Sequence, residues 1–115
     1  MRFVANSVVT TREMVEKRPD TVKRFLAALL QGWRDALDPR NQEQAVQVLL
    51  EADRETPEAV VRRQLPVTRE LMLPAAGAEF GTIDAAAWKQ TEEILRSQKL
   101  IPGSVDVESL LFTFK

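Results

Sequence analysis

Residues 3–37 read FVANSVVTTREMVEKRPDTVKRFLAALLQGWRDAL. This pattern predicts a β-strand over Phe3–Thr10, a short helix over Arg12–Lys17 and a long amphipathic helix from Pro19 to Leu37. A lone strand leaves backbone donors and acceptors unpaired at both edges, so a stable protein must pair or cover them. We therefore expect the partner strands to come from a second copy of this chain or from a larger protein to which it belongs.

The long helix is the best-defined predicted element. Pro19 is tolerated in a first helical turn, and Asp20 meets the positive end of the helix dipole. The apolar residues recur at spacings of three and four, in the series Val22, Phe25, Leu26, Leu29, Leu30, Trp33 and Leu37. We expect this face to be packed, with Trp33 in a core or at a helix seam. Gly32 costs about 1 kcal/mol relative to Ala, so it marks either the close approach of another backbone or a tolerated imperfection.

The remainder of the sequence predicts further helices. A new helix follows Pro39, and another starts at Thr56–Glu58. Pro66 either kinks that helix or divides it, because proline removes a helical hydrogen bond. Residues 73–82 predict a loop, Asp84 caps a last clear helix, and residues 105–114 form an apolar segment without a clear assignment.

The composition is that of an ordinary globular protein. The 115 residues suffice for one domain, and we expect residues 1–115 to form a single domain. The 16 basic and 17 acidic residues leave a charge of −1, which provides no single-sign field for nucleic acid or an anionic membrane surface. No apolar run approaches the roughly 20 residues of a membrane span. The sequence contains no signal peptide, so we expect any export signal of an intact protein to lie upstream.

The sequence offers little catalytic chemistry. Histidine, cysteine and tyrosine are absent, which excludes histidine bases, thiolate metal sites and the triads built on them. We expect no catalytic residue, no metal site and no cofactor. Adjacent carboxylates such as Glu92 and Glu93 splay around a helix and are interpreted as surface residues. A small basic cluster near Pro66 is either a solvated face or a site for an anion or a protein partner; it comprises Arg62, Arg63 and Arg69.

Two segments together resemble a known family. They are RPDTVKRFLAALLQGWRDAL, residues 18–37, and FGTIDAAAWKQTEEILRSQKLI, residues 80–101. In this order and spacing they resemble the C-terminal part of substrate-binding proteins of ATP-binding-cassette (ABC) importers. The similarity is greatest to the branch of thiamine pyrimidine-precursor receptors and their eukaryotic pyrimidine-synthesis relatives, with nitrate, sulfonate and taurine receptors nearby.

The resemblance implies a fold and a function. The fold would be a C-terminal fragment of a two-lobed α/β periplasmic-binding-protein (type 2) fold, mainly α with one or two strands. The intact receptor would bind a thiamine pyrimidine precursor or a nitrate- or sulfonate-like solute and present it to an ABC permease and ATPase. It would be a periplasmic protein or an extracellular lipoprotein. Asn6 and Ser7 would lie on the strand that crosses between the lobes, so they are the ligand-binding candidates; otherwise they satisfy local backbone groups.

Two alternatives remain. In the first alternative, the chain is a free-standing helical module that dimerises through Phe3–Thr10, since like strands from two copies complete each other's edges. Alternatively it is a fragment of a thiamine-pyrimidine synthase, although such enzymes depend on histidine chemistry that this sequence lacks. In the receptor and module interpretations, we expect the isolated chain to form a homo-oligomer through its N-terminal strand.

Overall fold

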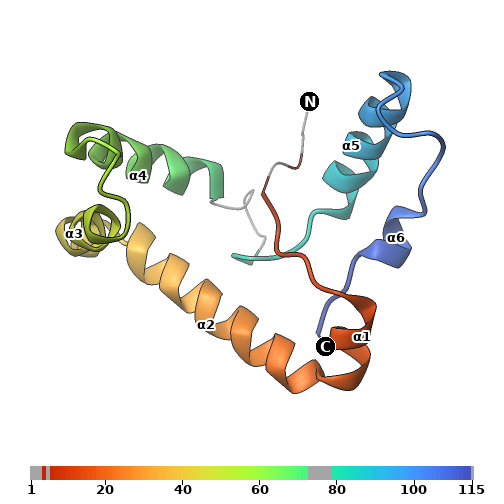
Figure 1. The fold of residues 1–115 in the computed structure, drawn as a ribbon, viewed down its shortest axis with the longest axis horizontal. Helices are drawn as coiled ribbons and strands as arrows, with labels where there is room; N and C mark the ends of the chain where they lie inside the picture. Colours follow the sequence, from red (N-terminus) through yellow and green to blue (C-terminus); the bar gives the residue numbers. More distant parts are fainter. Residues whose placement is uncertain (1–3, 5, 73–78, 115) are drawn as a thin grey trace. The chain divides into compact units, whose positions relative to one another are not determined.

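The computed structural model describes residues 4, 6–72 and 79–114, and every regular element within these ranges is helical (Figure 1). The helices are α1 (Arg12–Lys17), α2 (Pro19–Leu37), the short 3-10 helix η1 (Pro39–Asn41), α3 (Gln42–Ala52), α4 (Glu58–Met72), α5 (Ala85–Ser97) and α6 (Val107–Leu110). The chain divides into two compact units. One comprises Met1–Arg18 with Ile83–Lys115, and the other comprises Pro19–Thr82.

The strand predicted over Phe3–Thr10 is wrong for the part that the structure describes. Val4 and Asn6–Thr10 form neither helix nor strand, while Phe3 and Ala5 lie outside the described residues. A strand exists only as one side of a hydrogen-bonded ladder, and no other described segment supplies the second side. The prediction of a mainly helical chain is confirmed, and the prediction of one or two strands is not.

The predicted helix starts are confirmed by their caps. The Thr11 hydroxyl accepts a hydrogen bond from the backbone N–H of Met14 at 3.1 Å, and the Asp84 carboxylate accepts one from Ala87 at 3.0 Å. Each satisfies a first-turn donor that has no partner inside its helix. Pro66 does not divide its helix, because α4 continues through it to Met72.

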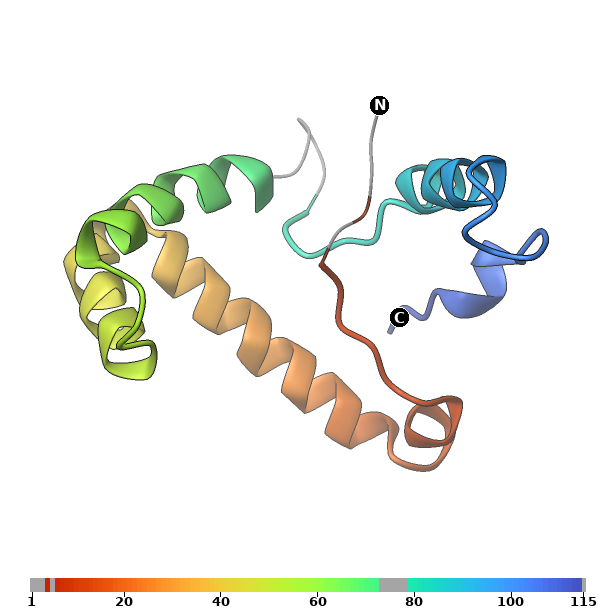
Figure 2. The same cartoon turned by 45° about the horizontal axis from the view of Figure 1, so that its top comes forward.

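The 19–82 unit has a small core between α3 and α4. Val46 is fully buried, Val61 and Leu65 are 3% and 4% exposed, and Ala45 and Leu50 pack against them. These helices lie against the C-terminal end of α2 (Figure 2). The core is therefore built from two short helices and one end of a long one.

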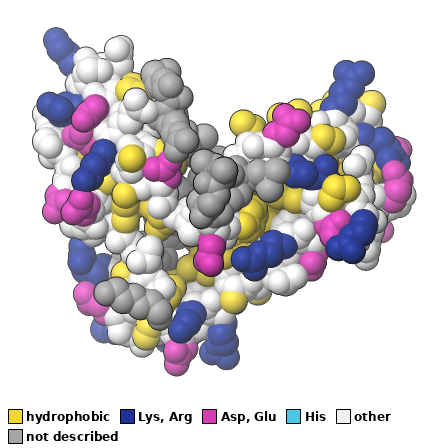
Figure 3. Space-filling model, turned by 180° about the vertical axis from the view of Figure 1, so that it is seen from behind, with side chains coloured by type: hydrophobic (Ala, Val, Ile, Leu, Met, Phe, Trp, Pro, Cys, Tyr) yellow, Lys and Arg dark blue, Asp and Glu magenta, His cyan; other side chains and the backbone are white. Residues whose placement is uncertain are grey.

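The apolar face of α2 is covered only in part, so the expectation that it is packed holds for some of its residues and not for others. Leu37 is the one buried residue of this helix, whereas Phe25 and Trp33 are 57% and 36% exposed. No atom lies within 4 Å of a Cβ built at Gly32, so the close approach of another backbone is not realised here. Hydrophobic side chains accordingly reach the surface among charged ones (Figure 3).

Residues 80 and 81 cover another side of α2; of the loop predicted over residues 73–82, residues 73–78 lie outside the described residues. The guanidinium of Arg34 lies 5.6 Å from the centre of the Phe80 ring, within range of a cation–π contact. Gly81 packs so closely on Leu30 that a Cβ at Gly81 would lie 2.5 Å from the leucine Cδ2. The chain therefore returns onto one side of α2 and leaves the neighbouring side open.

Helix α5 ends in a Schellman motif with a lysine in the left-handed position. Lys99 has φ = 57°. The N–H of Leu100 donates to the carbonyl of Leu95 at 2.9 Å, and the N–H of Lys99 donates to the carbonyl of Arg96 at 3.0 Å. This position usually holds glycine, because a Cβ crowds the backbone there.

We expect Lys99→Gly to stabilise the protein by about 1 kcal/mol, since it relieves the left-handed strain while keeping both hydrogen bonds. Urea denaturation followed by circular dichroism measures the change. Gln98→Gly is the matched control, because Gln98 has φ = −85° and gains nothing from glycine. Equal or lower stability of the Lys99→Gly variant relative to wild type would contradict the strain argument.

Candidate functional site

The segment that leads to the ligand-binding candidates is anchored on α5. The backbone N–H of Val4 donates to the Thr91 hydroxyl at 3.0 Å, and that hydroxyl donates to the carbonyl of Ala87 at 2.8 Å. Thr91 is only 6% exposed, so this is a specific contact between residues 87 positions apart in the sequence. The Thr91 hydroxyl thus accepts the hydrogen bond from the Val4 N–H that a backbone carbonyl of a neighbouring strand would accept in a sheet.

Asn6 and Ser7 follow this anchor and are both exposed. Neither side chain hydrogen-bonds another described residue, so the interpretation that they satisfy local backbone groups gains no support. Their assignment to a ligand site stays a prediction. Sequence reasoning missed Thr91, although its place four residues after Ala87 on the inner face of α5 is the signal that could have found it.

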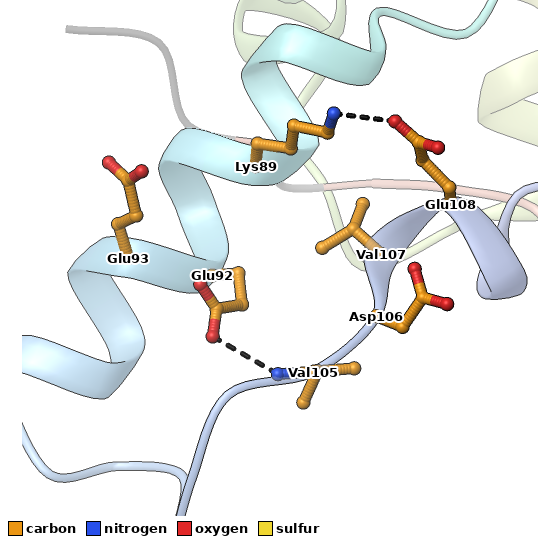
Figure 4. Close-up of a pocket in the computed structure, with 7 residues that line it drawn as sticks. All are labelled: Lys89, Glu92, Glu93, Val105, Asp106, Val107 and Glu108. Atoms are coloured by element: carbon orange, nitrogen blue, oxygen red, sulfur yellow. Dashed lines mark hydrogen bonds and ion pairs between the residues drawn. The ribbon is translucent and has the colours of Figure 1, made fainter.

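A shallow hollow of about 290 Å³ lies between α5 and α6 (Figure 4). Lys89 and Glu108 point toward each other across it, with Nζ and Oε1 2.6 Å apart. Glu92 accepts a hydrogen bond from the backbone N–H of Val105 at 3.2 Å. Both contacts tie the segment 105–108 to α5, so these polar groups hold α6 in place.

The charges of this hollow disfavour an anionic ligand. One amine faces four carboxylates, and the lining comprises Lys89, Glu92, Glu93, Val105, Asp106, Val107 and Glu108. The hydrogen bond from Lys89 lowers the pKa of Glu108 below its usual value, and the same bond raises the pKa of Lys89. The positive charge of Lys89 is therefore already paired with the Glu108 carboxylate and is not free to bind nitrate or a sulfonate.

In the basic cluster near Pro66, Arg62 pairs with carboxylates. Its two terminal nitrogens donate to the two Glu43 oxygens at 2.6 and 3.0 Å, and its Nε donates to Glu58 at 2.8 Å. The Arg62 hydrogen bonds lower the pKa of Glu43. Arg62 thus joins α3 to α4, and the solvated-face interpretation fits it better than an anion site.

The other two arginines of the cluster differ in their surroundings. The Nε of Arg69 donates to the carbonyl of Leu37 and so caps the end of α2. The Nη2 of Arg69 is buried and has no hydrogen-bond partner among the described residues. Arg63 lines a second open hollow of about 380 Å³ along α4, with Val60, Gln64, Val67 and Thr68. The structure does not bring the three arginines together on one ligand.

The turn after α2 contains the carboxylate with the largest lowering of pKa in the described residues. Asp38 accepts hydrogen bonds from the side chain and the backbone N–H of Arg40, and they lower the Asp38 pKa to about 2. Because the folded-state pKa is depressed, this contribution to stability is present above the unfolded pKa and is lost as the pH falls through about 2.

We expect Arg40→Gln to raise the pKa of Asp38 toward its ordinary value, because the variant lacks the charged hydrogen bond that is the main cause of the shift. Carboxyl carbon chemical shifts followed by NMR from neutral pH to below about pH 2 measure it. Arg54→Gln is a control on the same unit, remote in sequence from this pair. An Asp38 titration curve that is identical in wild type and Arg40→Gln would show that the pair does not form in solution.

Within residues 4, 6–72 and 79–114 no three carboxylates gather in a way that could hold a metal ion. No helix in the same ranges has the length and apolar character required to cross a membrane.

The comparisons with known proteins confirm the resemblance that the sequence suggests. Residues 1–45 match the family model described as NMT1/THI5 like. Over 113 residues the chain is 26% identical to the riboflavin-binding protein RibY of Chloroflexus aurantiacus. That alignment covers 92% of this chain and 31% of RibY, so the chain spans about a third of the relative it matches. No solved structure matches it significantly. The chain thus resembles part of an NMT1/THI5-like substrate-binding protein.

Proposed function

We propose that this chain, with its resemblance to NMT1/THI5-like substrate-binding proteins, is part of the substrate-binding component of an ABC importer. The observation that carries the proposal is the alignment of 92% of the chain to a protein named for binding riboflavin. In this proposal residues 1–115 form one domain that corresponds to the C-terminal subdomain of a two-lobed receptor. The permease and ATPase of the importer are its partners, and the receptor works in the periplasm or as an extracellular lipoprotein.

The proposed substrate is a small heteroaromatic molecule, either a thiamine pyrimidine precursor or a flavin. The name of the matching relative favours this class. The described charges count against the alternative of nitrate or a sulfonate, because the α5–α6 hollow is acidic and Arg62 is paired with two carboxylates. A heteroaromatic ring needs stacking and a few hydrogen bonds, not a cluster of free cations.

Asn6 and Ser7 are the proposed ligand contacts of this chain. Their side chains are exposed, and the Val4–Thr91 hydrogen bond fixes the backbone just before them. An amide and a hydroxyl supply both donors and acceptors, which suits the ring nitrogens and exocyclic groups of a pyrimidine or flavin. The remaining contacts would come from regions equivalent to the rest of RibY, since this chain aligns with 31% of it.

The unpaired segment Asn6–Thr10 gives the isolated chain a second proposed property, which is self-association through strand pairing. Val8 and Val9 are 52% and 84% exposed, and no backbone hydrogen bond joins this segment to another described residue. In an intact receptor the same segment would pair within that protein. An unpaired segment Asn6–Thr10 is therefore expected both of a dimerisation module and of a receptor fragment. The two proposals are distinguished by whether solute uptake depends on this chain.

The isolated 115-residue chain is expected to show no ligand-induced thermal stabilisation. Riboflavin, a thiamine pyrimidine precursor and nitrate, each at about 1 mM, should shift its melting temperature by less than about 1 °C, because only a well-formed site stabilises the folded state. Differential scanning fluorimetry with intrinsic tryptophan emission measures this. A shift of several degrees with any one probe would show that these residues contain a nearly complete site.

Uptake of labelled solute tests the proposed function. Deleting the gene should abolish high-affinity uptake of riboflavin or of the pyrimidine precursor, and expression of the gene from a plasmid should restore it. A strain that takes up both solutes normally but cannot make the thiamine pyrimidine would instead favour the synthase alternative. Normal uptake together with normal growth would overturn the receptor proposal and favour the dimerisation module.

A further inference from the structure

Helix α5 buries two residues, Ala87 and Thr91, which lie one helical turn apart and are 7% and 6% exposed. At this buried strip the backbone N–H of Val4 donates to the Thr91 hydroxyl at 3.0 Å. A valine at position 91 would fill nearly the same volume without burying a polar atom. The hydroxyl therefore adds something that the packing of α5 does not require, namely an acceptor for the N-terminal segment.

The two partners of the Thr91 hydroxyl fix its roles. A hydroxyl has one proton to donate, and that of Thr91 goes to the carbonyl of Ala87 at 2.8 Å. The N–H of Val4 can only donate, so it takes a lone pair of the same oxygen. A β-branched side chain in a helix has few rotamers. Thr91 therefore offers Val4 an acceptor whose position is set by α5 itself.

The part of α5 that carries this acceptor is capped. The Asp84 carboxylate accepts from the backbone N–H of Ala87 at 3.0 Å, and the Ala87 carbonyl accepts from Thr91. Ala87 is thus held through both of its backbone polar groups. Because a cap reduces fraying of the turns that follow it, the acceptor stands on a firm part of the helix.

Covalent geometry links this anchor to the ligand-binding candidates. Asn6 and Ser7 are two and three residues beyond Val4. Their Cα atoms therefore lie within about 7 and 11 Å of the Val4 Cα, whatever the backbone conformation. Val4 is half-buried, whereas Asn6 and Ser7 are exposed. The hydrogen bond to Thr91 thus restricts where the two exposed side chains can lie.

We propose that Thr91 is a positioning residue of the ligand site, and this inference rests on the function proposed above. Its hydroxyl holds Val4 so that Asn6 and Ser7 meet the heteroaromatic substrate at a fixed place. Thr91 is buried and acts only through the segment that it anchors. With the anchor formed, the segment is ordered before the substrate arrives, so its ordering does not weaken binding.

Thr91→Val removes the acceptor and keeps the shape of the side chain. In an intact receptor that contains residues 1–115, we expect this variant to raise the dissociation constant for the bound probe about five- to tenfold, since the anchored segment is then less populated. The probes are riboflavin and a thiamine pyrimidine precursor. Thr91→Ser keeps the hydroxyl and should stay within about threefold of wild type. Equilibrium dialysis at a temperature where every variant is folded measures these constants.

Ser97→Ala is the matched control on the same helix. The Ser97 hydroxyl also donates to a carbonyl of α5, that of Ile94, at 2.8 Å, but Ser97 is exposed. Its removal should leave the affinity unchanged. If Ser97→Ala lowered the affinity as much as Thr91→Val does, any weakening of α5 would explain the loss, and the positioning role would be overturned.

A double-mutant cycle shows whether Thr91 acts through Asn6 and Ser7. In the Asn6→Ala, Ser7→Ala background, Thr91→Val should lower the affinity by less than about twofold, because the side chains that it positions are gone. A purely structural residue would not show this dependence on the background. The same fold loss in both backgrounds would overturn the positioning role.

Hydrogen exchange in the isolated chain tests the anchor without any ligand. The Val4 amide should exchange at least about tenfold faster in Thr91→Val than in wild type or Thr91→Ser, because its acceptor is missing. NMR spectroscopy measures the exchange rates. Equal rates in the three proteins would overturn the anchor.

These outcomes separate the positioning role from the proposed function. If the wild-type receptor binds a probe and the Thr91→Val receptor binds it equally well, the positioning role alone is overturned. If the wild-type receptor binds neither probe, the proposed function is overturned and the positioning role falls with it.

Discussion

Val46→Asp is expected to abolish the cooperative unfolding transition of the 19–82 unit. Val46 has no exposed surface and lies at the centre of the contact between α3 and α4, against Val61 and Leu65. The variant loses the burial of the valine and places a carboxylate among the apolar side chains of Val61 and Leu65. Together these effects cost about 4 kcal/mol or more, which is comparable with the entire stability expected of a unit this small.

Val48→Asp provides the control for this prediction. It makes the same chemical change two residues along α3, at a side chain that is 58% exposed. Both variants lower helix propensity equally, so the difference between them reports burial alone. Thermal melts followed by far-ultraviolet circular dichroism distinguish the two. Equal melting curves would mean that the α3–α4 core does not form as described.

Gly81→Ala is expected to destabilise the same unit by about 2 kcal/mol, because Gly81 has φ = 84°, where a side chain strains the backbone. Its new methyl group would also lie 2.5 Å from Cδ2 of Leu30. The leucine can move its flexible end, but the backbone strain remains. The substitution should therefore release residues 80–82 from α2 and weaken the Arg34–Phe80 contact.

Gly103→Ala is the matched control, because no atom lies within 4 Å of its Cβ position and its φ is outside the left-handed range. It should change stability by no more than about 0.5 kcal/mol. Urea denaturation of the two variants gives the comparison. If Gly81→Ala were as stable as Gly103→Ala, the turn at Gly81 would not adopt the described conformation.

The helices could be predicted from the sequence because their signals are local. The Thr11 and Asp84 caps, and the break between Arg18 and Pro19, depend on residues a few positions apart. Such signals act through the backbone itself and need no distant partner. The ion pair of Glu13 and Lys17 is local in the same way: the two residues lie four positions apart on α1, with their charged atoms 2.8 Å apart.

The strand and the packing of α2 could not be predicted in the same way, because both depend on segments far away in sequence or in another molecule. The β-branched residues of Phe3–Thr10 favour a strand, but a strand also needs a partner. Thr91 instead satisfies Val4 from 87 positions away, which no local pattern reveals. The apolar period of α2 correctly predicted a helix but could not indicate that Phe25 and Trp33 stay exposed.

The candidate site was predicted only by family resemblance. Nothing in the spacing of Asn6 and Ser7 distinguishes them from ordinary polar residues, and the structure leaves both exposed. The absence of histidine and cysteine, by contrast, is a property of the sequence alone, and it removes the commonest catalytic groups whatever fold the chain adopts.

Equilibrium dialysis of an intact receptor that contains residues 1–115 as its C-terminal subdomain, against labelled riboflavin and a labelled thiamine pyrimidine precursor, tests the central claim most directly. We expect this receptor, unlike the isolated chain, to bind one of them saturably with a dissociation constant of about 1 µM or tighter, weakened at least about tenfold in the Asn6→Ala, Ser7→Ala double variant. Failure of the folded receptor to bind either molecule would contradict the assignment to a substrate-binding component of this class.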